Sequence, residues 1–488
     1  MISAINNETI EYPSNDEFYS PDEKYPEYPF HHIARKPNEV YRSVRGLFQQ
    51  AGMDVEHYGT RLWNPFGKWI SSGQTVFVLC NFVYHRRPRE SLKEFQSKCT
   101  HGSIIRAVID YIFIAVGPMG RIRFGNAPLQ SCVWPRVLNQ TGGQRVEAFY
   151  ASVKAPVESA DLRLFINEHS GNLLASKVEA HPEEMGVTID LSQRSLLAAL
   201  DGQETHYRVS DYNPEHTGSF HANGSHRYVL HRHIVESDVI FSIPKLKTHE
   251  KVGITCAIKG CVGAIGHKDC LAHHRRGTPQ HGGDEFRSDP LGLLACLSSF
   301  HDLVQRSQPG TLYGHSLRLF LRGLRSLIRR IAPTMNGAWS GNDTCWRMAI
   351  DIARLIGYAR RDGSISSELQ RPHLALLDGI IGGDGNGPLN PRPVESGVLV
   401  FADNPVDLDF CATRIMGYDP NTLPIVREAA RLTDLPLFEA NNHCSSDPDD
   451  SQESFNASMA IVNGKVESLE DLGKFAARPY RLPKGWSR

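Results

Sequence analysis

The segment "SDVIFSIPKLKTH", residues 237–249, indicates the fold class of this chain. Val239–Ile243 is a run of apolar and β-branched residues typical of a buried strand, and we expect Pro244 to end that strand. Lys245 and Lys247 then follow where the carboxyl end of the strand would lie. Because ligands of α/β proteins bind beyond the carboxyl ends of parallel strands, the segment predicts an α/β fold with an anion-binding site there.

Three further parts of the chain have a similar organisation. Residues 75–83 form a run typical of a buried strand, residues 101–117 have helical spacing that stops at a glycine, and residues 121–128 resemble a short strand that ends in a loop. In "HLALLDGIIGGDGNGP", residues 373–388, an apolar run leads into a glycine and aspartate loop. In "SGVLVFADNPVDLDFCATRIMG", residues 396–417, a strand precedes a helix. The alternation predicts a mainly parallel sheet with flanking helices.

The length of 488 residues exceeds that of one ordinary core, so we expect either two packed units or one enlarged α/β domain with insertions. The predicted organisation also includes a helical insertion, because residues 290–358 have mostly helical spacing. The predicted boundaries are an irregular N-terminal arm at 1–70, an α/β unit with a lysine-rich glycine loop at 71–290, the insertion at 291–362, and a C-terminal α/β unit with Gly/Asp loops at 363–488.

The composition is that of a soluble globular protein, with 40% hydrophobic and 22% charged residues. A formal charge of −1 gives no overall electrostatic attraction to nucleic acid, so an anion site would have to be local. No apolar run is long enough to span a membrane, and the start lacks a signal peptide's apolar core. The ten cysteines form no CxxC pair and no ferredoxin-type run, so we expect free thiols, a cytoplasmic location and no intrinsic iron–sulfur cluster.

The lysine-rich segment carries the first group of candidate site residues. Lys245 and Lys247 alternate around Leu246, so they share one face of an extended chain, and His249 continues that face. Glycines beyond them would let backbone N–H groups approach a phosphate or carboxylate, although the spacing is not that of a nucleotide-binding P-loop. An ordinary solvated loop is the alternative interpretation. The candidate catalytic residues are Lys245, Lys247, His249 and Lys259.

Two other polar segments carry the second group. "HKDCLAHHRRGTPQHGGDEF", residues 267–286, is dense in histidines, carboxylates and paired arginines, which suits a metal site, acid–base chemistry or an anion clamp. The Gly/Asp segments suit a hard cation, or simply turns and helix starts with capping aspartates. The candidate metal ligands are His273, His281, Asp284, Asp384 and Asp407. The candidate cofactor-binding residues are Gly253, Gly260, Gly263, Arg275, Arg276, Gly385 and Asn386.

"LRLFLRGLRSLIRR", residues 317–330, has leucines at a helical period with arginines opposite them. Such a basic amphipathic helix could dock on a membrane or an acidic partner. The alternative is one solvated wall of the helical insertion.

Three motifs resemble a known family: "IPKLKTHEKVGITCAIKGCVG" (243–263), "DGIIGGDGNGP" (378–388) and "ADNPVDLDFCATRIMGYDP" (402–420). They are similar to the domain-of-unknown-function 362 family, and "YPEYP", "LWNPFGKWI" and "GNDTCWR" resemble its long subgroup, without the ferredoxin-like domain that some members append. The resemblance covers most of the chain but implies no activity. Leu79 and Cys80 stand where the family usually has Lys-Pro, and Asn126 stands where it usually has aspartate.

These observations support an enzyme that acts on a phosphate- or carboxylate-bearing small molecule in a pocket of Lys, His and Asp at strand ends. Isomerisation or epimerisation and oxidoreduction both remain open as reaction types. A metal ion or a phosphate-bearing cofactor is compatible with the candidate residues. The alternatives are a cofactor- or metal-binding carrier without turnover, and an accessory protein that docks through the arginine-rich segment.

Overall fold

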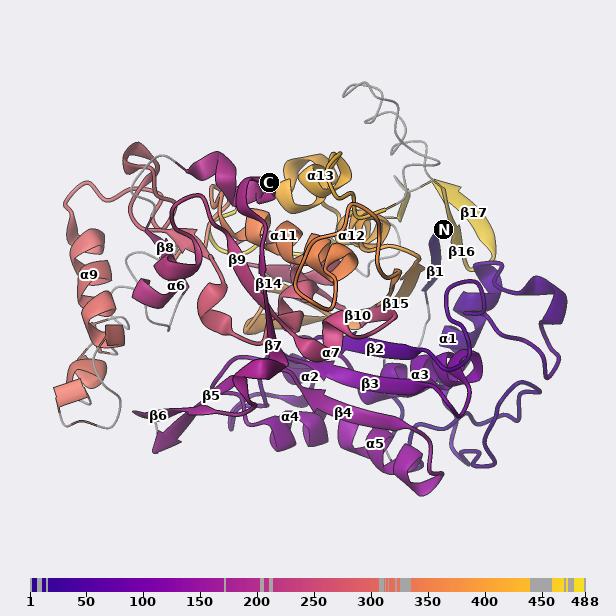
Figure 1. Ribbon diagram of the computed structural model, residues 1–488. Coiled ribbons are helices and arrows are strands. Elements are labelled where there is room, and N and C mark those ends of the chain that lie inside the picture. Colours follow the sequence, from indigo (N-terminus) through magenta and orange to yellow (C-terminus); the bar gives the residue numbers. More distant parts are fainter. Residues whose placement is uncertain are drawn as a thin grey trace.

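A large mixed sheet organises the molecule in this computed structural model (Figure 1). The structure describes residues 2–6, 11–14, 16–170, 173–201, 206–209, 214–306, 311, 313–314, 316–320, 323–324, 335–438, 459–468, 471–472 and 478–486. The strands are β1 Ile2–Asn6, β2 Thr75–Cys80, β3 Arg121–Asn126, β4 Val157–Asp161, β5 Phe165–Ser170, β6 Leu173–Glu179, β7 Gly186–Asp190, β8 Tyr207–Arg208, β9 Arg227–His231, β10 Val239–Ile243, β11 Lys245–His249, β12 Gly253–Ile254, β13 His274–Arg275, β14 His373–Asn386, β15 Asn390–Ala402, β16 Met459–Val462 and β17 Lys465–Ser468. The helices are α1 Glu39–Gln50, α2 Leu92–Gln96, α3 Gly102–Val116, α4 Trp134–Thr141, α5 Gly143–Ser152, α6 Pro214–Phe220, α7 Arg232–Val235, α8 Cys256–Gly260, α9 Leu293–Arg306, α11 Cys345–Tyr358, α12 Pro405–Ile415 and α13 Pro424–Ala430.

The order of the main sheet is β17-β16-β1-β15-β14-β10-β2-β3-β4, and β11 joins it beside β14. From β14 to β4 through β10, β2 and β3, every neighbouring pair is parallel. Antiparallel pairs occur where β15 meets β14 and β1. The predicted α/β class with a mainly parallel sheet and flanking helices is therefore confirmed.

Alternate side chains of β2 belong to two different apolar clusters, which cover the two faces of the sheet. Phe77 and Leu79 belong to one apolar cluster, which also takes in buried residues of α8, α11, α12 and α13. Val76, Val78 and Cys80 belong to a second cluster, with residues of α1, α3 and α5. A strand buried on both faces needs apolar residues at nearly every position, which is the pattern of 75–80.

Two segments expected to be loops are strands. After Pro244 the chain resumes as β11, which pairs with β14 across a register shift between Lys245 and Lys247. The predicted Gly/Asp loop at 378–388 lies almost wholly within β14, which runs on to Asn386 beside β15. Glycine and aspartate are poor strand formers, but the pairing on both sides outweighs that local preference.

The N-terminal arm and the insertion both contribute to the interior. Tyr19, Trp63 and Phe66 of the arm are buried in the second cluster, so these residues do more than wrap the surface. Within the predicted insertion, α11 packs into the first cluster, whereas α9 lies at one side of the molecule (Figure 1). Most of the arginine-rich segment, including Arg322 and Arg325, lies outside the described residues.

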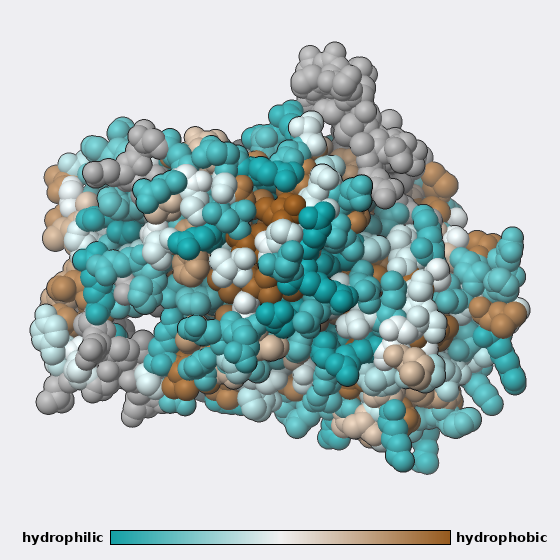
Figure 2. All heavy atoms as spheres, in the orientation of Figure 1, coloured by the Kyte–Doolittle hydropathy of each residue, from teal (hydrophilic) through white to brown (hydrophobic). Residues whose placement is uncertain are grey.

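The face seen in Figure 2 is mostly hydrophilic, with apolar residues grouped near its middle. Within the described part of the chain, no helix is both long and apolar enough to cross a membrane.

Candidate functional site

Lys245 begins β11 and is wholly buried in an ion pair. Its Nζ lies 2.9 Å from Asp378 Oδ1 on β14 and donates to the Tyr12 hydroxyl at 2.6 Å. The Tyr12 hydroxyl donates to Asp378 at 2.6 Å, and the backbone N–H of His101 donates to the other carboxylate oxygen at 3.1 Å. This candidate catalytic lysine is thus already neutralised by a carboxylate within the protein.

Lys247, one step further along β11, has neutral partners instead. Its Nζ donates to Asn81 Oδ1 at 2.5 Å and to the carbonyl oxygen of Lys98 at 2.6 Å. Asn81 directly follows β2, so β11 sets this lysine over the carboxyl end of a parallel strand. The pKa of Lys247 is lowered to about 7, mainly by burial and to a smaller extent by the nearby charges of Lys245 and Lys98. Two neutral acceptors do not cancel the charge of a dry ammonium.

The segment after β12 forms the short helix α8, and Asp409 of α12 anchors its beginning. The Asp409 carboxylate accepts hydrogen bonds from the backbone N–H groups of Ala257 at 2.6 Å and Ile258 at 3.0 Å. Cys256 has φ of 36°, a left-handed value that is uncommon for a residue with a side chain. The N–H groups expected to meet a ligand anion at this turn therefore bind the protein's own carboxylate.

Two of the candidate glycines have a structural explanation: a close approach at Gly263 and a left-handed backbone at Gly253. A Cβ on Gly263 would lie 3.1 Å from the side chain of Asn126 at the end of β3, and Gly263 accepts a hydrogen bond from the N–H of Ala127 at 2.7 Å. Gly253 has φ of 87° at the β11–β12 turn. The loop after α8 thus covers the carboxyl end of β3.

Five basic side chains join Lys247 to form what we call the basic cluster. Each is at most 7% exposed, apart from His273, which is partly buried. The charges of Lys259, Lys251 and Lys247 all act on His249, and those of Lys259, Lys251 and Lys268 act on His273. The members are Lys247, His249, Lys251, Lys259, Lys268 and His273.

Burial is the main cause of the perturbed pKa values in the cluster. It lowers the pKa of Lys259, lowers that of Lys268 to about 7, and lowers that of His249 well below its ordinary value. The neighbouring lysines add to the effect on His249, so its imidazole is neutral at physiological pH.

The hydrogen-bond partners of the cluster lysines are neutral wherever they are known. Lys251 donates to the carbonyl oxygen of Asn336, and Lys268 to that of Val262. Lys259 has no hydrogen-bond or ion-pair partner among the described residues. Asp161, whose charge acts on Lys268, is paired with Arg163, and Asp378 is paired with Lys245. The cluster is consequently a buried excess of positive charge.

Polar groups without partners lie at the neighbouring strand ends. Both side-chain atoms of Gln130, Oδ1 of Asn126 and Oγ1 of Thr255 are buried without a hydrogen-bond partner within the described residues. These three side chains are at most 4% exposed. Buried polar atoms are normally paired, and because the amide oxygens of Asn126 and Gln130 only accept hydrogen bonds, they suit a ligand that carries hydrogen-bond donors.

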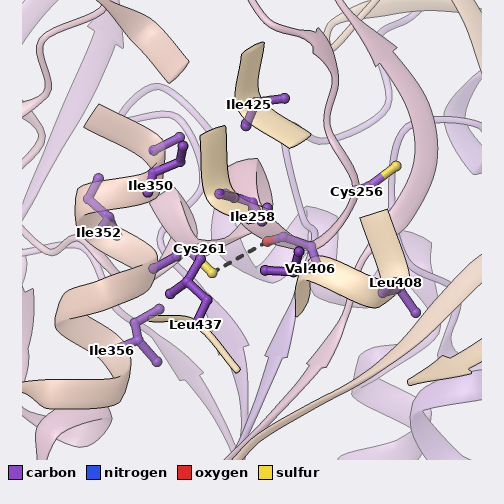
Figure 3. Packing of buried hydrophobic residues seen from close by; sticks show 14 of the residues in the cluster. Cys256, Ile258, Cys261, Ile350, Ile352, Ile356, Val406, Leu408, Ile425 and Leu437 are labelled. Atoms are coloured by element: carbon purple, nitrogen blue, oxygen red, sulfur yellow. Dashed lines mark hydrogen bonds between the residues drawn. The ribbon is translucent and has the colours of Figure 1, made fainter. Parts of the chain in front are cut away.

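The apolar side chains of α8 pack against α11 and α12 and form what we call the apolar wall. Figure 3 shows Ile258 and Cys261 packed among side chains that include Ile350 of α11 and Val406 of α12. This wall excludes water from one side of α8, the helix that carries Lys259.

The five candidate metal ligands are not gathered into one site. Asp384 lies 2.5 Å from Arg478 and 3.3 Å from Arg392, Asp284 accepts from Thr344 at 2.6 Å, and Asp407 accepts from the Asn404 amide at 2.9 Å. His281 pairs with Thr278, and His273 belongs to the basic cluster. In the part of the chain that the structure describes, no group of three or more His, Cys, Asp or Glu residues is arranged to hold a metal ion.

The remaining cofactor candidates lie in four places. Arg275 donates to Thr344 at 3.2 Å, whereas Arg276 and His281 line a surface cavity of about 780 Å³ away from β11. Gly385 and Asn386 bind the backbone of the C-terminal segment, through the carbonyl of Arg481 and the N–H of Lys484. Gly260 lies 3.9 Å, measured from a Cβ position, from Asn81 and Pro244.

Several site residues were not singled out from the sequence. Lys251 and Lys268 lie within or beside the quoted motifs, so the density of lysines could have indicated them. Tyr12 and Gln130 come from distant parts of the chain and gave no local signal, and Asp409 was noted only as one of the aspartates at the start of a helix.

The fold and the cluster define an α/β protein with a buried cationic site at the carboxyl ends of parallel strands. Residues 203–414, which include β10, β11, α8 and β14, match the family described as "Domain of unknown function (DUF362)", which bears out the resemblance of the sequence motifs in that region. The chain is also 41% identical over 280 residues to "Thylakoid-associated protein sll1697" of Synechocystis sp., a match that spans 57% of this chain and 62% of that protein. No solved structure matches the chain.

Proposed function

We propose that this protein is an enzyme that binds a phosphate- or carboxylate-bearing small molecule at the basic cluster. The observation that carries the proposal is the set of three buried lysines, Lys247, Lys259 and Lys268, none of which has a carboxylate partner among the described residues. A buried charge without a counter-charge is costly, and a bound anion would remove that cost.

Within this proposal His249 transfers protons. Its neutral imidazole can accept a proton from a substrate that the lysines hold, and lysines with lowered pKa values can return one. These are the groups that isomerisation or epimerisation uses, so we favour that reaction class over oxidoreduction.

The binding step can be tested by calorimetric titration with sulfate, a dianion that does not change protonation near neutral pH. We expect Lys247→Met and Lys268→Met each to weaken sulfate binding at least tenfold, which is about 1.4 kcal/mol. Lys36→Ala is the matched control, because Lys36 is an exposed lysine paired with Asp16. Equal sulfate affinity in all four proteins would refute the proposed site.

Turnover needs a separate test, because a carrier would bind the same anions. The protein is incubated with a mixture of phosphate- and carboxylate-bearing metabolites, and mass spectrometry follows their consumption. An enzyme depletes at least one of them, and Lys247→Met slows that depletion. Anion binding without any depletion, or a metal or cofactor retained through purification, would favour the carrier alternative.

We also propose, as a second candidate function, that the α9 side of the molecule docks on an anionic lipid surface. Leu291, Leu293 and Phe320 are each more than 60% exposed, and Arg318, Arg322 and Arg325 occur in the same part of the sequence. The relative from Synechocystis is named as thylakoid-associated, which supports a membrane surface as the partner.

Vesicle flotation tests this second proposal. The protein should float with phosphatidylglycerol vesicles but not with phosphatidylcholine vesicles, and Leu319→Ser/Phe320→Ser should abolish flotation. Leu62→Ser, a change at another residue that is 71% exposed, should float like the wild type. Equal flotation with both kinds of vesicle, or flotation of the double variant, would contradict lipid docking through this side of the molecule.

A further inference from the structure

We infer that Lys259 is a nucleophile that forms a Schiff base with the carbonyl group of an anionic keto or aldehyde compound. This inference rests on the proposed function, because it names the substrate class of the same site. The inference assigns to Lys259 a role that the other lysines of 245–268 do not share, because each of those four lysines is held by its own hydrogen-bond partners.

The contacts of these lysines decide which one can react. Lys245 is held by Asp378, Lys247 by Asn81 and the Lys98 carbonyl, and Lys251 and Lys268 by the carbonyl oxygens of Asn336 and Val262. Lys259 is 7% exposed and has no such partner among the described residues. An amine whose lone pair and hydrogens are not engaged is the one available to attack a carbonyl carbon.

The surroundings of Lys259 also keep its amine reactive. Burial lowers its pKa, and the charge of Lys251 acts in the same direction. Neighbouring cations and an apolar wall are the two arrangements that activate lysine nucleophiles. The other lysines of the cluster remain as counter-charges for the substrate's anionic group.

Asp409 and Asn126 position the reaction. The Asp409 carboxylate fixes the first turn of α8, so it orients the helix that ends with Lys259 and Gly260. Asn126 and Gln130 offer buried polar atoms without partners among the described residues for the polar remainder of the substrate. Asp409 is thus a positioning residue, and the two amides are candidates for substrate contact.

The chemical step is balanced without a further reactant. The Nζ lone pair of Lys259 forms a C–N bond as the C=O π bond opens, and a proton moves from nitrogen to oxygen to give a carbinolamine. Loss of the hydroxyl group as water takes up one further proton, which a protonated neighbouring lysine of the cluster supplies, and leaves the protonated imine. His249, on whose imidazole the charge of Lys259 acts more strongly than any other, is the neutral group that can relay these protons. The imine withdraws electrons from the adjacent C–H bond, which suits the proton-transfer chemistry proposed above.

Trapping with glyoxylate and cyanoborohydride tests the inference, because glyoxylate carries both an aldehyde and a carboxylate. After brief exposure of the full chain at pH 7, peptide mapping should find carboxymethyl groups on Lys259 at least ten times faster than on the exposed Lys36. Sulfate should protect Lys259 from modification. Modification of Lys259 no faster than that of Lys36, or unaffected by sulfate, would overturn the Schiff-base role.

The variant Lys259→Arg separates this inference from the proposed function, since arginine keeps the charge but forms no such imine under these conditions. We expect it to bind sulfate within threefold of the wild type while losing the rapidly modified site. Wild-type protein that binds sulfate but is not trapped at Lys259 would refute the inference and leave the proposed function standing. Loss of sulfate binding in Lys247→Met alone supports the site, whereas absence of sulfate binding in the wild type would defeat both. Near-ultraviolet circular dichroism checks that each variant is folded.

Discussion

Binding of a dianion at the basic cluster should draw protons from solution, and the number of protons can be worked out from the structure. Lys247 and Lys268 have pKa values of about 7, so each is about half protonated at pH 7 and about one tenth protonated at pH 8. A unit negative charge 4 Å from each ammonium contributes about 4 kcal/mol at an effective dielectric constant of 20, which is equivalent to about three pKa units. Both lysines would then be almost fully protonated in the complex.

The expected uptake per sulfate is therefore about one proton at pH 7, about two protons at pH 8 and about 0.2 protons at pH 6. Sulfate affinity should fall as the pH rises from 6 to 9, because the protons must then be taken from a more dilute solution. Titration calorimetry in buffers of different ionisation enthalpy measures the uptake directly, since the observed heat varies linearly with that enthalpy. Sulfate is the right probe because it does not titrate in this range.

The variants sharpen this test. Lys247→Met removes one of the two titrating lysines, so it should about halve the uptake at pH 8, whereas Lys36→Ala should leave it unchanged. Sulfate binding with no proton uptake at pH 8 would show that the buried lysines are already charged without a ligand. That result would refute the lowered pKa values of Lys247 and Lys268 from which the proton uptake is calculated.

Three further predictions concern stability. Asp378→Asn leaves Lys245 buried without its counter-charge and should lower the free energy of unfolding by about 3–5 kcal/mol, whereas Lys245→Met/Asp378→Leu should recover most of it; chemical denaturation measures both, and a loss below about 1 kcal/mol in the single variant would contradict the pairing. Burial raises the pKa of Asp409 to about 7, so the folded state binds more protons than the unfolded state between pH 4 and 7, and this contribution is present at low pH and lost as pH rises through 7. Asp409→Asn should flatten that part of the stability profile, and an unchanged slope would show that Asp409 ionises normally. Asp384→Asn removes the negative charge opposite Arg478 and one of the two acceptor oxygens of the side chain, and should cost about 1–3 kcal/mol whether or not Ca²⁺ is added. A Ca²⁺-dependent difference in the melting temperature would instead support a cation site at Asp384.

Local sequence patterns were enough to predict the parallel core. The runs at 75–80 and 239–243 are apolar at successive positions because both faces of β2 and β10 are covered, and Gly117 ends α3 with φ of 66° as its position suggested. The same patterns failed at 378–386, where glycine and aspartate predicted a loop. There β15 on one side and β11 on the other supply the hydrogen bonds that local preference does not.

The sequence by itself placed lysines next to a strand end, and alternation along an extended chain put Lys245 and Lys247 on one face. Only the tertiary structure decided what each lysine does. Tyr12, Asp378 and Asn81 reach β11 from residues far away in the sequence, so one lysine gains a carboxylate and the next gains only neutral oxygens. Since the charge state of a buried amine depends on its desolvation and its neighbours, no pattern within 245–268 could distinguish Lys245 from Lys259.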